Sequence, residues 1–240
     1  MKFQTALHLI YPPRCLTCGG MVDSDFGLCG PCWRDTPFIS GMVCDLCGTP
    51  LIGGKPGEVA HCDDCMAVDR PWRQGRSAMV YGDNARRIVL ALKHGDRQDL
   101  AAPAGHWMAR ALAGIDAETM LIAPIPLHRL RLLKRRFNQS ACLSRTLSRI
   151  LNADHCPDLL TRTKRTTSLD GLGADARFDM LSGAISVSPS RQPLIVSRHV
   201  LLVDDVMTSG ATLAAATRAC LIGGANGVSV VTLARVAKAA

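Results

Sequence analysis

The sequence predicts an α/β protein in which a parallel sheet follows a small cysteine-rich module. Eight of the eleven cysteines lie before residue 66, whereas strand-like and helix-like stretches alternate from about residue 77 onward. Residues 1–75 hold six basic and eight acidic side chains, and the rest of the chain holds 22 basic and 12 acidic ones. We therefore predict two units, a cysteine-rich module over residues 1–72 and an α/β domain over residues 73–240.

The overall composition is that of a globular protein, with 48% hydrophobic and 20% charged residues among 240. Disordered and fibrous classes are therefore excluded. No apolar run reaches the roughly 18–20 residues that span a bilayer, so we predict no membrane span. The first residues lack the apolar segment and the small-residue cleavage site of a signal peptide. We expect a cytoplasmic protein.

The cysteines before residue 66 form four C-x-x-C pairs, a spacing that directs two sulfurs toward one metal ion. The first and third pairs continue into glycine and the others do not, which indicates a repeated two-pair unit. Two pairs supply the four thiolates that suit tetrahedral Zn²⁺. The repeat favours two zinc ions bound by sequential pairs, and an interleaved arrangement is the alternative. The predicted zinc ligands are Cys15, Cys18, Cys29, Cys32, Cys44, Cys47, Cys62 and Cys65.

Disulfide bonds and redox catalysis are the competing interpretations of these cysteines. A disulfide framework needs an oxidising compartment, which the missing signal peptide argues against. A redox C-x-x-C is typically a single pair within a βαβ pattern, whereas this segment is rich in Gly, Pro and Asp. Zinc thiolate clusters also add negative charge to a segment that is already acidic. We therefore expect a structural or docking module rather than a non-specific binder of phosphate backbones.

The α/β domain begins with a predicted strand at residues 77–82. A helix is expected over residues 84–95, where Ala85, Ile88 and Leu92 recur at helical spacing and a glycine follows as a stop signal. A second helix is expected over residues 99–114, with Pro103 bending it or delaying its start. An apolar strand at residues 119–127 then continues into prolines.

The second half of the domain repeats this alternation. Residues 138–151 place their leucines and isoleucine on one helical face. Residues 199–205 form a nearly continuous apolar strand that ends in two acids, and residues 212–224 form a helix that ends at glycines. The last strand covers residues 227–235. Strands that alternate with helices predict a parallel sheet covered on both faces, with ligands bound beyond the carboxyl ends of the strands.

The stretch VLLVDDVMTSGATL (200–213) is the candidate site. Its strand delivers Asp204 and Asp205 to the sheet edge, and its loop opens a helix whose first amides form an anion cradle. Two carboxylates beside such a cradle suit the vicinal hydroxyls of a ribose, so we predict a site for ribose 5-phosphate. The alternative is a solvated turn before a capped helix. The predicted phosphate-binding residues are Val206, Met207, Thr208, Ser209, Gly210, Ala211 and Thr212.

This motif resembles the phosphoribosyl pyrophosphate (PRPP) motif of type I phosphoribosyltransferases. The opening PPRCLTCGG, the four cysteine pairs, LKHGDR (92–97) and PIPLHRLRLLKRRFNQS (124–140) are similar to the ComF/GntX-like family over nearly the whole chain. The resemblance implies a parallel-sheet type I phosphoribosyltransferase-like domain behind a zinc module with four-cysteine sites. Some members of the family are needed for DNA uptake in natural transformation. The resemblance thus implies single-stranded DNA as a partner, and other DNA-uptake proteins as partners of the zinc module.

The resemblance also implies roles for individual residues. Asp204 and Asp205 are expected to hold the ribose hydroxyls, and the loop after them the 5-phosphate. The segment 124–128 is expected to form the pyrophosphate loop, with Mg²⁺ on the PRPP. The groups expected to neutralise the leaving pyrophosphate are Lys93, Arg129, Arg135 and Arg136.

Two segments depart from the family's pattern. The family usually reads R-G-F-N-Q where Arg136 here replaces the glycine. Its lid usually reads T-x-S-Q-x-x-L and later R-N-L, and here Leu169 replaces the glutamine and Met180 the asparagine. Leu169 removes a polar group from the segment that closes over substrate in the family.

Residues 128–149 contain seven Lys and Arg side chains and no acid. A solvated helical face is the simplest interpretation of this basic run, and binding of pyrophosphate or of a nucleic-acid backbone is the functional one. Three hypotheses follow: a phosphoribosyltransferase, a non-enzymatic single-stranded nucleic-acid-binding protein on the same scaffold, and a PRPP-sensing regulator.

Overall fold

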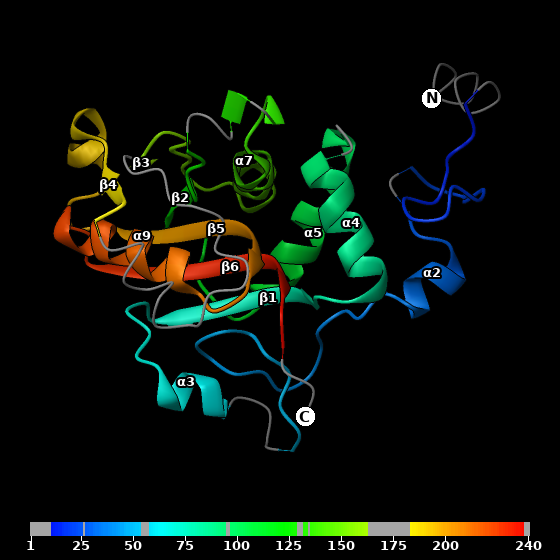
Figure 1. Cartoon of the computed structure of the whole chain (residues 1–240), viewed down its shortest axis with the longest axis horizontal. Helices are drawn as coiled ribbons and strands as arrows, with labels where there is room; N and C mark the ends of the chain where they lie inside the picture. Colours follow the sequence, from blue (N-terminus) through cyan, green and yellow to red (C-terminus); the bar gives the residue numbers. More distant parts are fainter. Residues whose placement is uncertain are drawn as a thin grey trace.

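The computed structural model of the chain describes residues 11–25, 27–53, 58–94, 97–128, 132–133, 135–162 and 183–237. At its centre lies a four-stranded sheet in the order β1-β6-β5-β2, and all neighbouring strands are parallel (Figure 1). The strands are β1 (Gln74–Val80), β2 (Leu121–Pro124), β5 (His199–Met207) and β6 (Gly227–Arg235). Because they are parallel, their carboxyl ends share one edge of the sheet, and Asp204 lies there beside Thr232.

Three helices cover one face of the sheet, namely α4 (Asp83–His94), α5 (Ala101–Ala111) and α7 (Gln139–Leu151) (Figure 1). A short 3-10 turn, η1 (Gln98–Leu100), leads into α5. Odd-numbered apolar residues in the middle of β5 and β6, namely Leu201, Val203, Val231 and Leu233, are buried against these helices. This follows from the two-residue period of a strand, which sends alternate side chains to opposite faces.

The other face is covered by α9 (Ala211–Ile222) and by the second half of the cysteine-rich segment, including α3 (Asp63–Ala67). Even-numbered residues of β5 and β6, such as Leu202 and Val230, share a buried cluster with Trp72, Cys44 and Cys47. Helices were predicted on both faces. The second face instead combines one helix with the second cysteine group, which is part of the core of the sheet.

The first cysteine group contacts helices α4 and α5, which cover the other face of the sheet. It includes the short helix α2 (Gly30–Arg34), and Asn84 of α4 donates from its side chain to the carbonyl of Cys32 over 3.2 Å. Phe38 stacks between Trp33 and Trp107, with ring centroids 4.5 Å and 5.3 Å apart. The two cysteine groups thus lie against different parts of the α/β domain.

Every predicted strand and helix of the α/β domain is present, with shifts at its ends. β2 is shorter than predicted because prolines end the ladder, and β5 runs two residues further than predicted, to Met207. Three short elements were not predicted: β3 (Leu160–Arg162), β4 (Ile185–Val187) and η2 (Pro189–Leu194). They are too short for a periodic pattern to reveal. Within the described ranges, the model contains no helix with the length and apolarity needed to cross a membrane.

Candidate functional site

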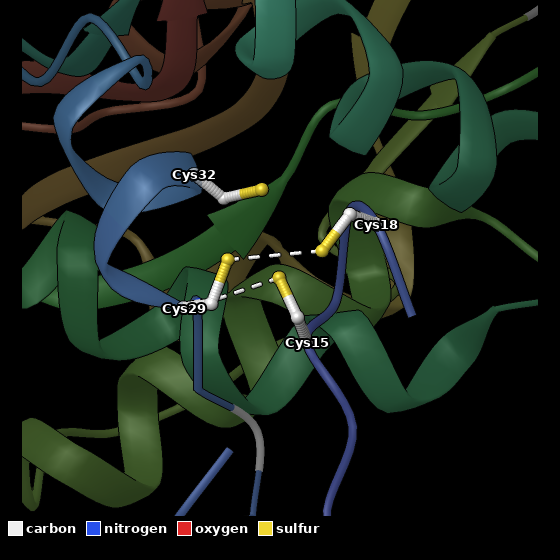
Figure 2. A group of neighbouring side chains, drawn as sticks. All are labelled: Cys15, Cys18, Cys29 and Cys32. Carbon is white, nitrogen blue, oxygen red and sulfur yellow. Dashed lines mark hydrogen bonds between the residues drawn. The ribbon is translucent and has the colours of Figure 1, made fainter. Parts of the chain in front are cut away.

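The cysteines form two clusters of four, and within each cluster the sulfurs lie within 4.8 Å of one another. The first contains Cys15, Cys18, Cys29 and Cys32, whose side chains point toward a common centre (Figure 2). The second contains Cys44, Cys47, Cys62 and Cys65. The predicted sequential pairing is therefore confirmed.

The geometry of both clusters fits zinc. Sulfurs 2.3 Å from a tetrahedral ion lie about 3.8 Å apart. The separation between the sulfurs of Cys18 and Cys29 is 3.7 Å, and that between Cys47 and Cys62 is 3.6 Å. Burial works against ionisation of Cys15, but hydrogen bonds from the Cys18 amide and neighbouring groups lower the pKa of its thiol to about 5. The chain thus has two zinc-binding sites of four cysteines each.

Strand β5 and helix α7 together position the two predicted carboxylates. Ser140, in the first turn of α7, donates its hydroxyl to Asp204 Oδ1 over 2.8 Å. Asp205 is buried and forms an ion pair with Lys93 from α4, with 3.2 Å between Nζ and Oδ1. Asn138 caps α7 by accepting from the Ser140 amide, which fixes the serine beside the carboxylate. Three elements therefore converge on this pair of acids.

Asp204 has an unusual protonation equilibrium. Loss of hydration and the adjacent charge of Asp205 raise the pKa of its carboxyl to about 7, against the lowering effect of the Ser140 hydroxyl and of Lys93. Desolvation and a like charge both disfavour the carboxylate form. Near neutral pH, both protonation states of Asp204 are therefore populated, and the side chain can present either an acceptor or a donor to a ligand hydroxyl.

The loop after β5 lines a small depression that is open to solvent. Three successive carbonyls in it are hydrogen-bonded to donors from other segments. The bonds run from Val236 N to Met207 O (2.9 Å), from Arg235 Nη1 to Thr208 O (2.9 Å) and from Arg70 Nη1 to Ser209 O (2.5 Å). Because the N–H and C=O of a trans peptide point in opposite directions, the amide that follows each carbonyl points away from these donors. Those amides precede the first turn of α9, whose N–H groups have no carbonyl partner within the helix. The first of them, on Ala211, donates to Ser209 Oγ over 3.4 Å.

Gly210 makes the tight turn between loop and helix possible. Its φ of 81° lies in the left-handed region that glycine adopts without strain. A Cβ at this position would lie 2.6 Å from Arg70 Nη1 and 3.1 Å from the Trp72 ring. The loop backbone therefore rests directly on these two side chains, which belong to the segment that follows the second zinc site.

The predicted leaving-group cations have different positions. Lys93 lies at the site, paired with Asp205. Arg135 donates to the Gln139 side chain over 3.3 Å, and Arg136 is exposed with a φ of 65°. That left-handed conformation explains why a glycine suits this position in the family's pattern. Arg129 and the lid residues Leu169 and Met180 lie outside the described residues.

Three functional candidates were missed by the sequence analysis: Ser140, Arg70 and Arg235. Arg235 is 2% exposed and Arg70 is 8% exposed, which is rare for a charged side chain without a specific partner. The available signal for Ser140 was its place at the end of the family-like segment 124–140. The two arginines gave none, because each was one of many basic residues.

Two four-cysteine zinc sites packed against a parallel α/β sheet define a double zinc-ribbon protein with an α/β domain. Residues 6–66 match the family described as "Double zinc ribbon domain". The chain is 28% identical over 216 residues to the DNA utilization protein YhgH of Escherichia coli, covering 88% of this chain and 91% of that protein. It is 28% identical to Competence protein F of Haemophilus influenzae (83% and 87% covered) and 26% identical to Competence protein ComFC of Bacillus subtilis (90% and 87% covered). The chain is a homologue of these proteins, which confirms the resemblance to the ComF/GntX-like family.

Solved structures align with part of this chain at low TM-scores. A glutamine PRPP amidotransferase from B. subtilis superposes with a TM-score of 0.40 at 14% identity, over 60% of this chain and 30% of the length of that one. A hypoxanthine phosphoribosyltransferase from Staphylococcus aureus superposes with a TM-score of 0.32 at 16% identity, over 60% of this chain and 68% of that one.

Proposed function

We propose that the loop from Met207 to Thr212 binds the 5-phosphate of PRPP or ribose 5-phosphate, with Asp204 and Asp205 beside the ribose hydroxyls. One observation supports this above the others. The carbonyls of three successive loop residues are bonded to donors from other segments, so the following amides point away from them, beside two carboxylates. Amides directed together at a helix N-terminus suit a phosphate, and acidic acceptors suit vicinal hydroxyls.

The remaining residues of the site suit a charged, departing group. Lys93 is the cation closest to the acids, and its ion pair with Asp205 keeps two adjacent carboxylates compatible. Mg²⁺ bound with PRPP offsets the charge of its pyrophosphate. Transfer of the phosphoribosyl group passes through an oxocarbenium-like state, so this chain's contribution to a transfer reaction is positioning and charge stabilisation.

A thermal-shift titration with ribose 5-phosphate and with PRPP plus Mg²⁺ tests this proposal. A ligand that binds only the folded state raises the melting temperature, and at a given concentration the rise is larger for a tighter ligand. We expect saturable stabilisation of the wild-type chain by both ligands and none of the double variant Asp204→Ala, Asp205→Ala. An unchanged melting temperature of the wild type with either ligand would refute the proposal.

A second candidate function is the handling of single-stranded DNA, alongside phosphoribosyl binding or in place of catalysis. It is favoured by the names of the relatives, which are DNA utilization and competence proteins. It is also favoured by the seven basic and no acidic residues of segment 128–149, among which Arg136 is exposed. Backbone phosphates bind such a surface in a salt-dependent way.

A further inference from the structure

The second zinc site lies directly behind the phosphate-binding loop. Its cysteines share a buried cluster with Trp72 and with Met207 and Leu213, which lie at the two ends of the loop. In Figure 1, α3 and the segment around it lie on the opposite side of the sheet from α4, α5 and α7. The zinc ligands and the residues at the two ends of the loop therefore belong to the same buried cluster.

Arg70 makes the first connection. Its guanidinium donates to the carbonyl of Ser209 and is also a positively charged neighbour of the zinc ligand Cys65. The same side chain stacks over the Trp72 ring, 5.5 Å from its centroid. Its Nε atom is buried and has no hydrogen-bond partner among the described residues. A guanidinium in this position is suited to a thiolate, which accepts hydrogen bonds more strongly than a neutral thiol.

Arg235 makes the second connection, through one intermediate hydroxyl. Its Nη1 donates to the carbonyl of Thr208 and its Nε donates to Thr49 Oγ1 over 2.7 Å. Thr49 Oγ1 lies 3.1 Å from the sulfur of the zinc ligand Cys47. Since the Thr49 oxygen accepts from Arg235, its own proton is available to the Cys47 thiolate.

Charge explains why these two arginines are tolerated in a buried position. Four thiolates around one Zn²⁺ carry a net charge of −2, and two guanidinium groups carry +2. Arg235 also forms an ion pair with Asp64, at 4.0 Å. Without zinc, no shared ion fixes the sulfurs of Cys47 and Cys65, so Thr49, Arg235 and Arg70 lose a fixed neighbour on the side away from the loop. The carbonyls of Thr208 and Ser209 are then no longer held, and neither are the peptide planes that direct the amides of Ser209 and Gly210.

The first zinc site offers an internal comparison. Its contacts run to α4 through Asn84 and to α5 through the stacked rings of Trp33, Phe38 and Trp107. Within the described part of the chain, no hydrogen bond joins its four cysteines to the loop from Met207 to Thr212. The two sites have the same four-cysteine ligand set, but only the second is connected to the loop.

We propose that zinc in the second site holds the phosphate-binding loop in its binding conformation through Arg70 and Arg235, whereas zinc in the first site does not. The ligand part of this inference rests on the function proposed above. By linkage, a phosphate ligand on the loop must also strengthen zinc retention at the second site, since coupling between two sites is reciprocal. Arg70 and Arg235 are positioning residues in this scheme and touch no ligand.

Hydrogen–deuterium exchange of the loop peptide covering residues 207–213, in the zinc-loaded full chain, tests the structural part without any ligand. We expect Cys65→Ser, which disables the second site, to speed loop exchange at least tenfold, and Cys32→Ser, which disables the first, to leave it unchanged. Arg70→Lys keeps all eight cysteines and the charge, but it removes the guanidinium that lies between the Ser209 carbonyl and Cys65. We expect this variant also to speed exchange of the loop amides. Arg73→Lys is its matched control, because Arg73 lies on the same segment and donates to the distant carbonyl of Asn226 over 2.7 Å.

Equal loop exchange in Arg70→Lys and Arg73→Lys would overturn the inference, and this comparison stands even if Cys65→Ser fails to fold.

The reciprocal effect is tested by measuring chelator-driven zinc release from Cys32→Ser, which retains only the second site, with and without PRPP and Mg²⁺. We expect PRPP to slow release about tenfold there and not at all in Cys65→Ser. If PRPP binds the wild type but leaves the zinc-release rates of Cys32→Ser and Cys65→Ser unchanged, the coupling is refuted and the proposed function stands. If PRPP fails to bind the wild type, the proposed function fails and loop exchange still decides whether zinc holds the loop.

Discussion

The hydroxyl of Ser140 donates a hydrogen bond to Asp204 Oδ1 over 2.8 Å, and it joins the start of helix α7 to the end of strand β5. The two residues are 64 positions apart in the chain. This contact ties the segment 124–140, which resembles the family's pyrophosphate loop, to the acids of the PRPP-like motif. Both parts of the sequence that led to the proposed function thus meet at one hydrogen bond.

Replacing Asp204 with asparagine should stabilise the protein in a pH-dependent way. The native pKa of about 7 exceeds the unfolded value of about 3.9, so the wild type loses stability as the pH rises from 4 to 7. The asparagine side chain retains an oxygen that accepts from Ser140 and carries no charge. The free-energy difference between Asp204→Asn and wild type should be near zero at pH 4 and grow to at most about 4 kcal/mol at pH 8. Urea unfolding at several pH values measures it, and a difference that stays flat with pH would contradict the raised pKa.

Replacing Gly210 with alanine should weaken phosphate binding. The new Cβ would meet Arg70 and the Trp72 ring, and alanine is strained at a φ of 81°. We expect the affinity for ribose 5-phosphate to fall at least tenfold in calorimetry. Gly114→Ala is the matched control, since Gly114 has a φ of 85° and no atom within 4 Å of an added Cβ. Similar losses of affinity in both variants would show that strain in a glycine turn, and not the packing under the loop, is responsible.

The full chain should contain two zinc ions, and each cluster should lose one when a ligand is removed. We expect metal analysis to give two equivalents for wild type and one each for Cys32→Ser and Cys65→Ser. Because Cys44 and Cys47 of the second cluster are completely buried in the core of the sheet, loss of that zinc should lower the melting temperature more. One equivalent in the wild type, or equal melting temperatures of the two variants, would contradict these roles.

Charge reversal of Lys134, Arg135 and Arg136 to glutamate should weaken binding of single-stranded DNA if the basic run contacts its backbone. Each lost phosphate contact reduces the slope of log affinity against log salt concentration by about 0.7, so three lost contacts reduce it by about 2. Reversal of Arg34, Arg110 and Arg218, which are all exposed, changes the net charge equally and serves as the control. Equal slopes in the two triple variants would refute a role for the basic run, and no binding by the wild type at low salt would refute the DNA candidate itself.

The parts of this molecule that were predictable from sequence are those with local causes. A C-x-x-C spacing brings two sulfurs together within one turn, and the repeat of Cys15 to Cys32 in Cys44 to Cys65 then gives the pairing. Likewise, a buried strand that ends in two acids and a glycine turn at Gly210 specify the loop within the single stretch 200–213. Helical periodicity found the helices for the same reason.

The parts that could not be predicted depend on contacts between distant segments. Arg70 reaches a carbonyl 139 residues away, and Arg235 reaches the hydroxyl of Thr49, 186 residues away. No periodicity or spacing records such contacts. For the same reason the second zinc site was expected to belong to a separate module, whereas Cys44 and Cys47 pack into the core cluster that α9 shares with the sheet.

The loop at the end of β5 is proposed to bind a phosphoribosyl group. Isothermal titration calorimetry of PRPP with Mg²⁺ into the zinc-loaded full chain tests it most directly, with Asp204→Asn, Asp205→Asn as the comparison variant. The proposed function predicts saturable binding of one PRPP per chain and at least tenfold weaker binding by the double variant. No saturable heat from the wild type, or equal affinity in the two proteins, would contradict it.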